Sequence, residues 1–111
     1  MEPIEINAGA WYLRALRSDK LIDDRPALAD LGETDPYYVD RRTSQWASDT
    51  GYTWAVCEPT TGELLAEVIL DPATATVHTR VRDGHADAAA SAADAVCRFA
   101  AAALGLIARR A

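Results

Sequence analysis

The chain has 111 residues, and its 17 aspartates and glutamates against 11 lysines and arginines give a net charge of −6. This length fits a single domain over residues 1–111, with one hydrophobic core. The acidic surplus disfavours binding to the phosphate backbone of nucleic acids, because no basic stripe reverses it locally. No apolar run comes near the ~20 residues that a membrane-spanning helix needs, so we expect no membrane contact.

The N-terminus and the cysteines bear on the cellular compartment and on metal binding. Residues Met1–Glu5 lack the basic and apolar regions of a signal peptide, so we expect a cytoplasmic protein. Cys57 and Cys97 are the only cysteines, and neither has a second cysteine or a histidine at metal-ligand spacing. We therefore expect two reduced, buried thiols and no bound metal.

The first third of the chain predicts a strand followed by short helical segments. Residues 4–16 alternate with the period of a pleated strand. Ser18-Asp19 then offers an N-cap for a short helix that reaches Ile22. Pro26 opens a further helical turn, which Gly32 ends.

A longer helix is predicted to begin at Asp35-Pro36, with the aspartate as its cap and the proline at the first helical position. Apolar residues spaced at i, i+4, i+7 and i+8 predict one buried face, and the pattern fades before Gly51. These residues are Val39, Thr43, Trp46 and Ala47.

Two segments in the middle of the chain predict a β-hairpin. Strand-forming residues dominate 52–57 and 64–70, and Pro59–Gly62 between them has the composition of a turn. Residues 75–82 alternate again and predict a further strand.

A long helix is predicted after these strands. Alanine, the strongest helix former, dominates the segment from Gly84 to Leu104, and Gly105 is the residue expected just past a helix end. Leu106–Ala108 begins another strand. The order of elements predicts an α+β fold with a mostly antiparallel sheet, N-terminal helices and one long helix packed on a face.

Particular residues accompany this order of elements: Gly9–Leu16 with Asp19, Trp54–Val56 with Thr61–Val68, and Phe99–Ala100 with Leu104–Leu106. Together with the order, they resemble the GCN5-related N-acetyltransferase (GNAT) superfamily and, within it, the RimJ/RimL-like branch. The resemblance extends over nearly the whole chain. It implies a GNAT-like fold whose C-terminal half is missing, because the family continues through a fifth strand, another helix and two more strands.

In that family, backbone N–H groups at the start of the long helix hold the pyrophosphate of acetyl-CoA. The corresponding segment here keeps a Gly-x-Ala at Gly84–Ala86, but then Val81 stands where the family has arginine or glutamine. Counting back from the helix instead puts His85 and Asp87 where the family has glycines. The resemblance makes five residues candidates for cofactor binding: Val81, Arg82, Gly84, His85 and Ala86.

The charge of this loop opposes a pyrophosphate. Asp83 and Asp87 add negative charge where the pyrophosphate would lie, so we expect acetyl-CoA to bind weakly or not at all. Arg80 or Arg82 could compensate by turning into the loop. We therefore expect no cofactor, or acetyl-CoA if the site is active.

Two side chains are candidates for the catalytic base that takes a proton from an acceptor amine. His78 lies on the polar face of the strand over 75–82, near where the family places the acetyl group, and Glu67 lies on the strand before it. The alternatives are that His78 is an exposed strand residue and that Glu67 is a solvated charge or a member of an ion pair. The family's tyrosine that protonates the leaving thiolate has no counterpart in the resemblance.

Three functions remain open from the sequence. The first is a GNAT-fold protein that no longer catalyses and acts through a protein partner or a homodimer. The second is an active acetyl-CoA-dependent N-acetyltransferase of the RimJ/RimL type, completed by dimerisation. The third is a small-molecule binding module without chemistry. The altered cofactor loop favours the first.

Overall fold

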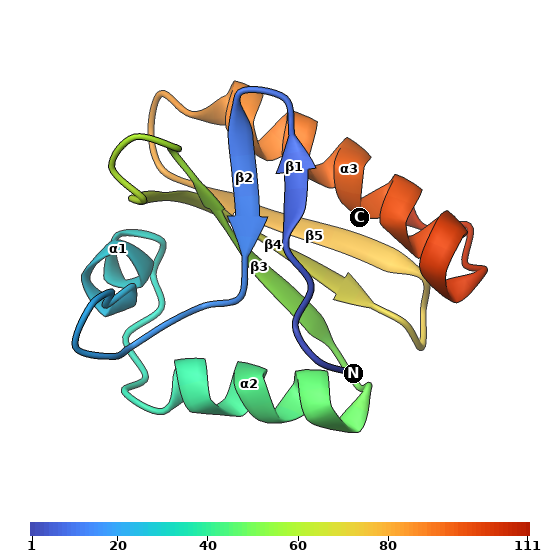
Figure 1. The fold of residues 1–111 in the computed structure, drawn as a ribbon, viewed down its shortest axis with the longest axis horizontal. Helices are drawn as coiled ribbons and strands as arrows, with labels where there is room; N and C mark the ends of the chain where they lie inside the picture. The colour runs from blue at the N-terminus through green and yellow to red at the C-terminus, as the bar shows by residue number, and fades with distance from the viewer.

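The computed structural model describes residues 1–111 and shows a six-stranded sheet with three helices (Figure 1). The strands lie across the sheet in chain order, and each neighbouring pair is antiparallel except β5 and β6, which are parallel. The predicted α+β fold is therefore confirmed. The strands are β1 (Ile6–Ala8), β2 (Trp11–Arg14), β3 (Tyr52–Cys57), β4 (Leu64–Asp71), β5 (Thr76–Val81) and β6 (Arg109–Arg110), and the helices are α1 (Arg25–Asp30), α2 (Tyr38–Ser48) and α3 (Ala86–Leu104).

The N-terminal segment is a hairpin of two strands, and not the single strand predicted over residues 4–16. β1 and β2 pair antiparallel, with Ile6 opposite Leu13. Gly9, in the turn between them, has a φ of +66°, a left-handed conformation that glycine adopts without steric cost. Alternation alone did not reveal the break, because the residues on both sides of the turn keep the period of a strand.

Residues 18–23 form a loop where a short helix was predicted, and that prediction was wrong. The carboxylate of Asp19 accepts hydrogen bonds from the backbone N–H groups of Leu21 and Ile22, at 2.9 and 3.0 Å. An aspartate that bonds the N–H groups just ahead of it closes a turn as well as it caps a helix. The sequence correctly indicated that Asp19 bonds backbone N–H groups, but the element that it closes is a turn and not a helix.

The two shorter helices follow. α1 has Pro26 in its first turn and ends before Gly32, as predicted. α2 begins at Tyr38, slightly later than predicted, because Asp35 closes a turn ahead of it and accepts a hydrogen bond from the N–H of Tyr37 at 2.9 Å.

The inner face of α2 is rotated from the predicted one. Val39 and Trp46 are buried as predicted, but Thr43 and Ala47 are exposed. Because burial here depends on side chains that hydropathy scores as polar, the 3.6-residue pattern indicated the wrong stripe. The side chains that instead face inward beside Val39 and Trp46 are Tyr38, Arg42 and Gln45.

The remaining elements lie close to their predicted positions. β3 and β4 form the predicted antiparallel hairpin, with an irregularity between Val56 and Cys57. α3 covers most of the predicted segment, and Gly105 ends it with a φ of +64°.

Burial raises the pKa of the Cys57 thiol to about 12, so this cysteine stays protonated at neutral pH.

The last strand is short. It was predicted over Leu106–Ala108 but forms at Arg109–Arg110, where it pairs with β5 only through Thr76 and Val77. The rest of the outer edge of β5 therefore has no neighbouring strand.

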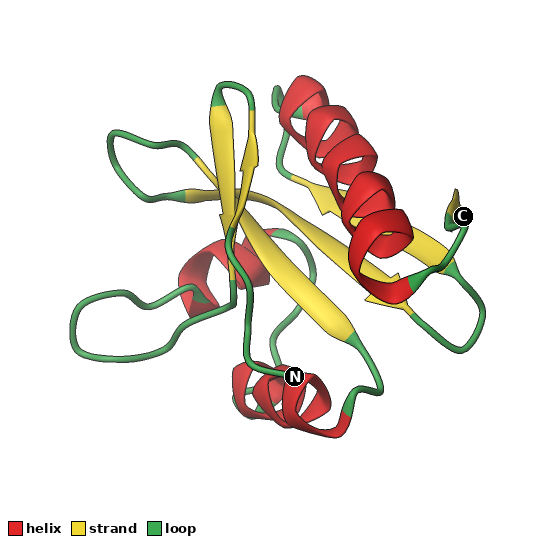
Figure 2. Cartoon of the chain, turned by 45° about the vertical axis from the view of Figure 1, so that its right-hand side comes forward, coloured by secondary structure: helices red, strands yellow, loops and turns green.

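The sheet separates α3 from α1 and α2 (Figure 2). Alternate residues of β4 belong to the larger core, which lies under α3. On the other face, Leu28 of α1 and Val39 of α2 belong to a smaller core. α3 contacts the sheet mainly through small side chains, which let the helix backbone lie close to the strands. Its buried residues are Ala88, Ala89, Ala92, Ala93, Ala95, Val96 and Ala100.

Aromatic side chains connect α2, β3 and α3. The ring centroids of Trp46 and Trp54 lie 5.0 Å apart with an interplanar angle of 85°. Phe99 adds an edge contact to Trp54 at 5.5 Å. Each indole N–H donates to a backbone carbonyl, Trp46 to Thr53 and Trp54 to Ile4. Both tryptophans are core residues, and Trp46 lies on the buried face predicted for it.

A buried ion pair fixes the loop between β2 and α1. Both carboxylate oxygens of Asp24 accept hydrogen bonds from the guanidinium of Arg14, each at 2.8 Å. One of these oxygens also accepts from the N–H of Arg17 at 2.7 Å, and Arg14 donates to the carbonyl of Gly62 at 3.2 Å. Asp24 stands at the N-cap position of α1 but makes no side-chain cap bond, because its oxygens face Arg14.

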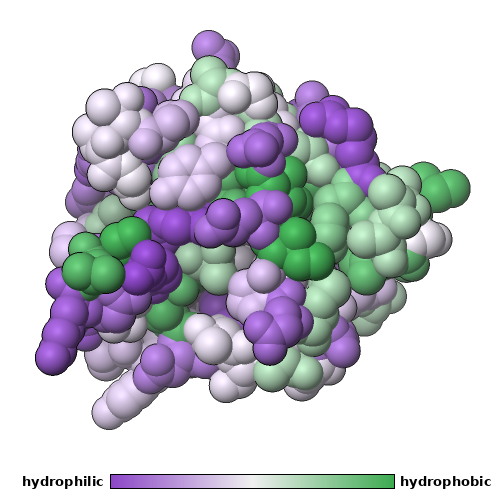
Figure 3. All heavy atoms as spheres, in the orientation of Figure 1, coloured by the Kyte–Doolittle hydropathy of each residue, from purple (hydrophilic) through white to green (hydrophobic).

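The surface is mixed in character. In Figure 3 the side of the molecule on which α3 lies is the more apolar, whereas the loop between β2 and α1, at the lower left, is mostly hydrophilic. None of the helices is long and apolar enough to cross a membrane.

We expect Asp24→Ala to lower the free energy of unfolding by about 3–5 kcal/mol, because it leaves the Arg14 charge buried without its partner. Asp23→Ala is the matched control, since Asp23 is the next residue back and its ion pair with Arg25 is solvent-exposed. Urea denaturation monitored by tryptophan fluorescence measures both. Equal losses for the two variants would contradict a structural role for the buried pair.

Candidate functional site

A fully buried glutamate lies between the sheet and α2. Glu67 of β4 has no solvent-exposed surface. One carboxylate oxygen accepts a hydrogen bond from Nε of Arg80 at 2.8 Å, and the other accepts from the hydroxyl of Tyr38 at 2.6 Å. The guanidinium of Arg80 also donates to the Tyr38 oxygen at 3.0 Å, so each of the three side chains is hydrogen-bonded to the other two.

Register and helix position bring these three groups together. Glu67 and Arg80 are directly opposed in the antiparallel pair of β4 and β5, so their side chains project from the same face of the sheet. Tyr38 reaches that face from the first turn of α2. Arg80 also donates to Glu33 at 3.3 Å, so two carboxylates surround its single charge. Burial and the hydrogen bond to Glu67 raise the pKa of Tyr38 to about 12.

Beside this network lies an open hollow of about 610 Å³ between α2 and the sheet. Its floor includes Ile69 and His78, which are directly opposed on β4 and β5. Its wall is the inner face of α2, and the turn at Thr50 and Gly51 forms one end. The charged and polar residues that line the hollow are Glu33, Tyr38, Arg42, Gln45, Asp71, His78 and Arg80.

The two sequence candidates for a catalytic base occupy different environments on this face. Glu67 is the member of an ion pair, which was one of the alternatives left open by the sequence. His78 is exposed, lines the hollow, and has its Nε2 3.2 Å from the Thr76 hydroxyl. The two side chains project from the same sheet face, but no hydrogen bond joins them.

The candidate cofactor loop precedes α3. Gly84 has a φ of +85°, and no heavy atom lies within 4 Å of the position of a Cβ there, so its backbone is open to solvent. His85 stands at the N-cap of α3 but makes no side-chain cap bond. Ala86 begins the helix and Val81 is 40 % exposed at the end of β5. The structure thus gathers these candidates around the start of α3.

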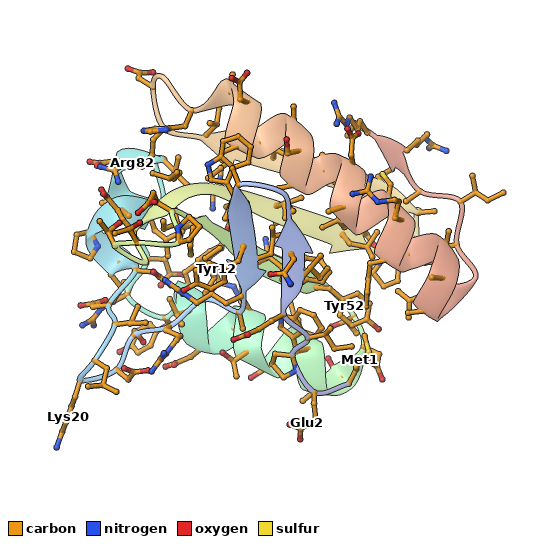
Figure 4. All side chains as sticks on the ribbon, turned by 45° about the horizontal axis from the view of Figure 1, so that its top comes forward. Met1, Glu2, Tyr12, Lys20, Tyr52 and Arg82 are labelled. Carbon is orange, nitrogen blue, oxygen red and sulfur yellow. The ribbon has the colours of Figure 1, made fainter.

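Arg82 turns away from this loop. Its guanidinium donates to Glu63 at 2.6 Å and to Asp30, at the end of α1, at 2.9 Å. Figure 4 shows the Arg82 side chain beside α1. Arg80 lies in the network with Glu67, so neither arginine faces the candidate pyrophosphate position. Asp83 and Asp87 are both exposed there.

A second, smaller hollow of about 280 Å³ lies between β5 and α3. Val77, Thr79 and Val81 line one side of it, and alanines of α3 line the other. Because β6 pairs only with the start of β5, the strand edge at Thr79–Val81 borders this groove without a partner strand.

Sequence reasoning did not identify Tyr38, Arg42 or Asp24 as parts of buried or half-buried polar clusters. The single available signal was Glu67 itself, an acid within the otherwise apolar strand over 64–70. A buried acid requires a partner, and the alternation over 75–82 already put Arg80 on the polar face of the neighbouring strand. The helical partner Tyr38 could not be found, because the pattern of α2 indicated a different face.

Comparison with solved structures identifies the fold. A structure from Vibrio cholerae, assigned as a ribosomal-protein-serine acetyltransferase, matches with a TM-score of 0.73 and 16% identity over 96% of this chain and 72% of that chain. A structure from Sphaerobacter thermophilus DSM 20745, assigned as an acetyltransferase, matches with a TM-score of 0.59 and 16% identity over 90% of this chain and 65% of its own. No protein-family model and no curated protein matches the chain. The chain has the acetyltransferase fold, which confirms the resemblance at the level of fold.

We expect Arg80→Gln to destabilise the protein by about 3 kcal/mol, because Glu67 would then be buried without a cation. Adding Glu67→Gln to that variant should recover part of the loss, since the buried charge is gone. Arg98→Gln, which removes an exposed cation from α3, is the matched control. Urea denaturation of these proteins and of Glu67→Gln alone measures the coupling, and strictly additive losses for Arg80→Gln and Glu67→Gln would contradict the network.

Proposed function

We propose that this protein uses the acetyltransferase fold without efficient acetyl-CoA chemistry, and that it acts through contact with a second protein chain. The observation that carries the first part is the charge around the start of α3. Four acidic residues surround the loop before α3 and the first turn of this helix: Asp30, Glu63, Asp83 and Asp87. The one guanidinium among them, that of Arg82, already forms ion pairs with two of the four.

Charge magnitudes favour repulsion of a pyrophosphate. A helix N-terminus attracts an anion by about 0.3–1 kcal/mol at an exposed site. Near the surface, the repulsion from each nearby carboxylate destabilises a bound pyrophosphate by roughly the same amount. The helix therefore does not offset both Asp83 and Asp87, and the arginines that would compensate are paired elsewhere.

The positions of the candidate bases also support weak catalysis. A general base needs a free lone pair within reach of the acceptor's proton. The oxygens of Glu67 accept hydrogen bonds from Arg80 and Tyr38, and the carboxylate is inaccessible to solvent. His78 is accessible, so any remaining proton transfer on this face depends on it.

The edge of β5 supports the contact with a second chain. On the outer edge of β5, residues from Thr79 to Val81 have no neighbouring strand. The groove beside them is lined mainly by valine and alanine side chains, together with Thr79 and Arg110. An unpaired strand edge beside an apolar groove can take up an extended segment by backbone hydrogen bonding. We propose a second copy of this chain as the occupant, with another protein as the alternative partner.

An active acetyl-CoA-dependent N-acetyltransferase of the RimJ/RimL type is the second candidate. The open backbone at Gly84 and the uncapped start of α3 favour it, because both leave N–H groups available to an anion. The two candidates differ in one property, the affinity for CoA.

Calorimetric titration with CoA and acetyl-CoA tests this difference. We expect weak or undetectable binding by the unmodified protein, and roughly tenfold tighter binding after Asp83→Gly with Asp87→Ala, because two repulsive charges are removed. Glu2→Gln with Asp40→Asn removes the same charge away from the loop and serves as the control. A dissociation constant of about 1–10 µM for the unmodified protein would instead support the acetyltransferase.

Sedimentation equilibrium tests the proposed contact. We expect a concentration-dependent dimer that Val81→Lys weakens by about tenfold or more, because a charged side chain would lie at the paired edge. Ala101→Lys adds the same charge at an exposed position of α3 and should leave the dimer unchanged. A monomer at all concentrations, unaffected by either change, counts against self-association and leaves another protein as the partner.

A further inference from the structure

The hollow between α2 and the sheet contains one cation that has no carboxylate partner. Arg42 lines this hollow, and its charge takes part in none of the ion pairs of the structure. Its Nε is buried and has no hydrogen-bond acceptor. A shielded guanidinium N–H without an acceptor is uncommon, because the lost hydrogen bond to water is not replaced.

The protein holds this guanidinium in place. One of its terminal nitrogens donates to Oε1 of Gln45 at 2.7 Å. Its central carbon lies 5.0 Å from the centroid of the Tyr38 ring, within the range of a cation–π contact. Tyr38 is fixed in turn by its short hydrogen bond to Glu67. Arg42 is therefore oriented by a side chain on each side before any ligand arrives.

Gly51 contributes space to the same arrangement. A Cβ at this position would lie 3.0 Å from Oε1 of Gln45, the atom that accepts from Arg42. The φ of Gly51 is not in the left-handed region, so the backbone itself does not require glycine. A side chain at Gly51 would therefore require Oε1 of Gln45 to shift by a few tenths of an ångström.

The other charged residues in the hollow limit the charge that a bound ligand can carry. Arg80 is matched by Glu67 and Glu33, and Asp71 stands at the opposite strand end with one oxygen bonded to the N–H of Ala73 at 2.9 Å. These carboxylates would repel a doubly charged phosphate more than a singly charged group. The terminal Nη2 of Arg42 makes no hydrogen bond within the protein, so it can donate to a carboxylate oxygen.

We propose that this hollow binds a small molecule through a carboxylate group, which Arg42 receives. The site lies across the sheet from α3, whereas the groove of the proposed dimer contact lies beside α3. His78 and Gln45 line the same hollow and are available to hydrogen-bond the rest of the molecule. Its volume of about 610 Å³ is within the range of small-ligand sites.

Nitrogen-15 NMR tests the proposal, because the Nε–H of Arg42 gives its own resonance. The probes are sodium acetate, butyrate and succinate, compared with sodium phosphate and chloride at matched ionic strength. We expect at least one carboxylate to shift the Arg42 Nε–H resonance with saturation at about 1 mM, and phosphate and chloride to leave it unmoved. Equal effects of phosphate and carboxylate, or no saturable shift by any carboxylate, would overturn the proposal.

Three variants locate the effect. Arg42→Lys keeps the charge but loses Nη2, so it should weaken carboxylate binding by about tenfold as followed by the backbone resonance of His78. Gly51→Ala requires Oε1 of Gln45 to shift by a few tenths of an ångström, so it should weaken binding by a smaller factor. Arg98→Gln, an exposed arginine of α3, is the control and should change nothing. Gly51→Ala alters no charged group, so it remains informative if Arg42→Lys unfolds. Unchanged affinity in both Arg42→Lys and Gly51→Ala would also overturn the proposal.

Discussion

The buried carboxylate of Glu67 is the constraint on which the α2 side of the molecule depends. A charge removed from water must be matched by a cation and by hydrogen bonds, and here Arg80 and Tyr38 supply them. These requirements fix the register of β4 against β5 and the position of the first turn of α2. Once Tyr38 is fixed, its ring provides the surface on which Arg42 rests. The polar hollow therefore follows from one acidic residue in an otherwise apolar strand.

Arg80 of β5 and the loop that follows β5 present opposite electrostatic situations. On the α2 side its charged residue is fully paired, whereas the loop after Val81 gathers acids around a helix start that would otherwise attract anions. Arg82 belongs to the strand end but is drawn to Asp30 and Glu63. The chain has the fold of an acetyltransferase, and in our proposal the acidic side chains make the start of α3 unfavourable for a pyrophosphate.

Sequence patterns predicted the elements whose signal is local and strong. The alanine-rich helix and the hairpin of β3 and β4 lie near their predicted bounds because propensity, periodicity and turn residues agree there. The hairpin of β1 and β2 was missed because alternation continues across Gly9, and the buried face of α2 was misjudged because it carries Tyr38 and Arg42. The candidate cofactor residues came from the resemblance, and their role stays a prediction. The network of Glu67, Arg80 and Tyr38 was not predicted, because its partners are set by tertiary contacts that no local pattern encodes.

The alanine face of α3 has a consequence for how this protein can change over time. Most core positions can lose atoms or gain them, but an alanine such as Ala92 or Ala100, each without exposed surface, offers almost nothing to remove. Substitutions there act in one direction only, because any larger side chain pushes the helix away from the strands along its length. Drift in the sequence of α3 is therefore confined to its outer face, while the spacing between the two layers remains that of the smallest side chains in the core.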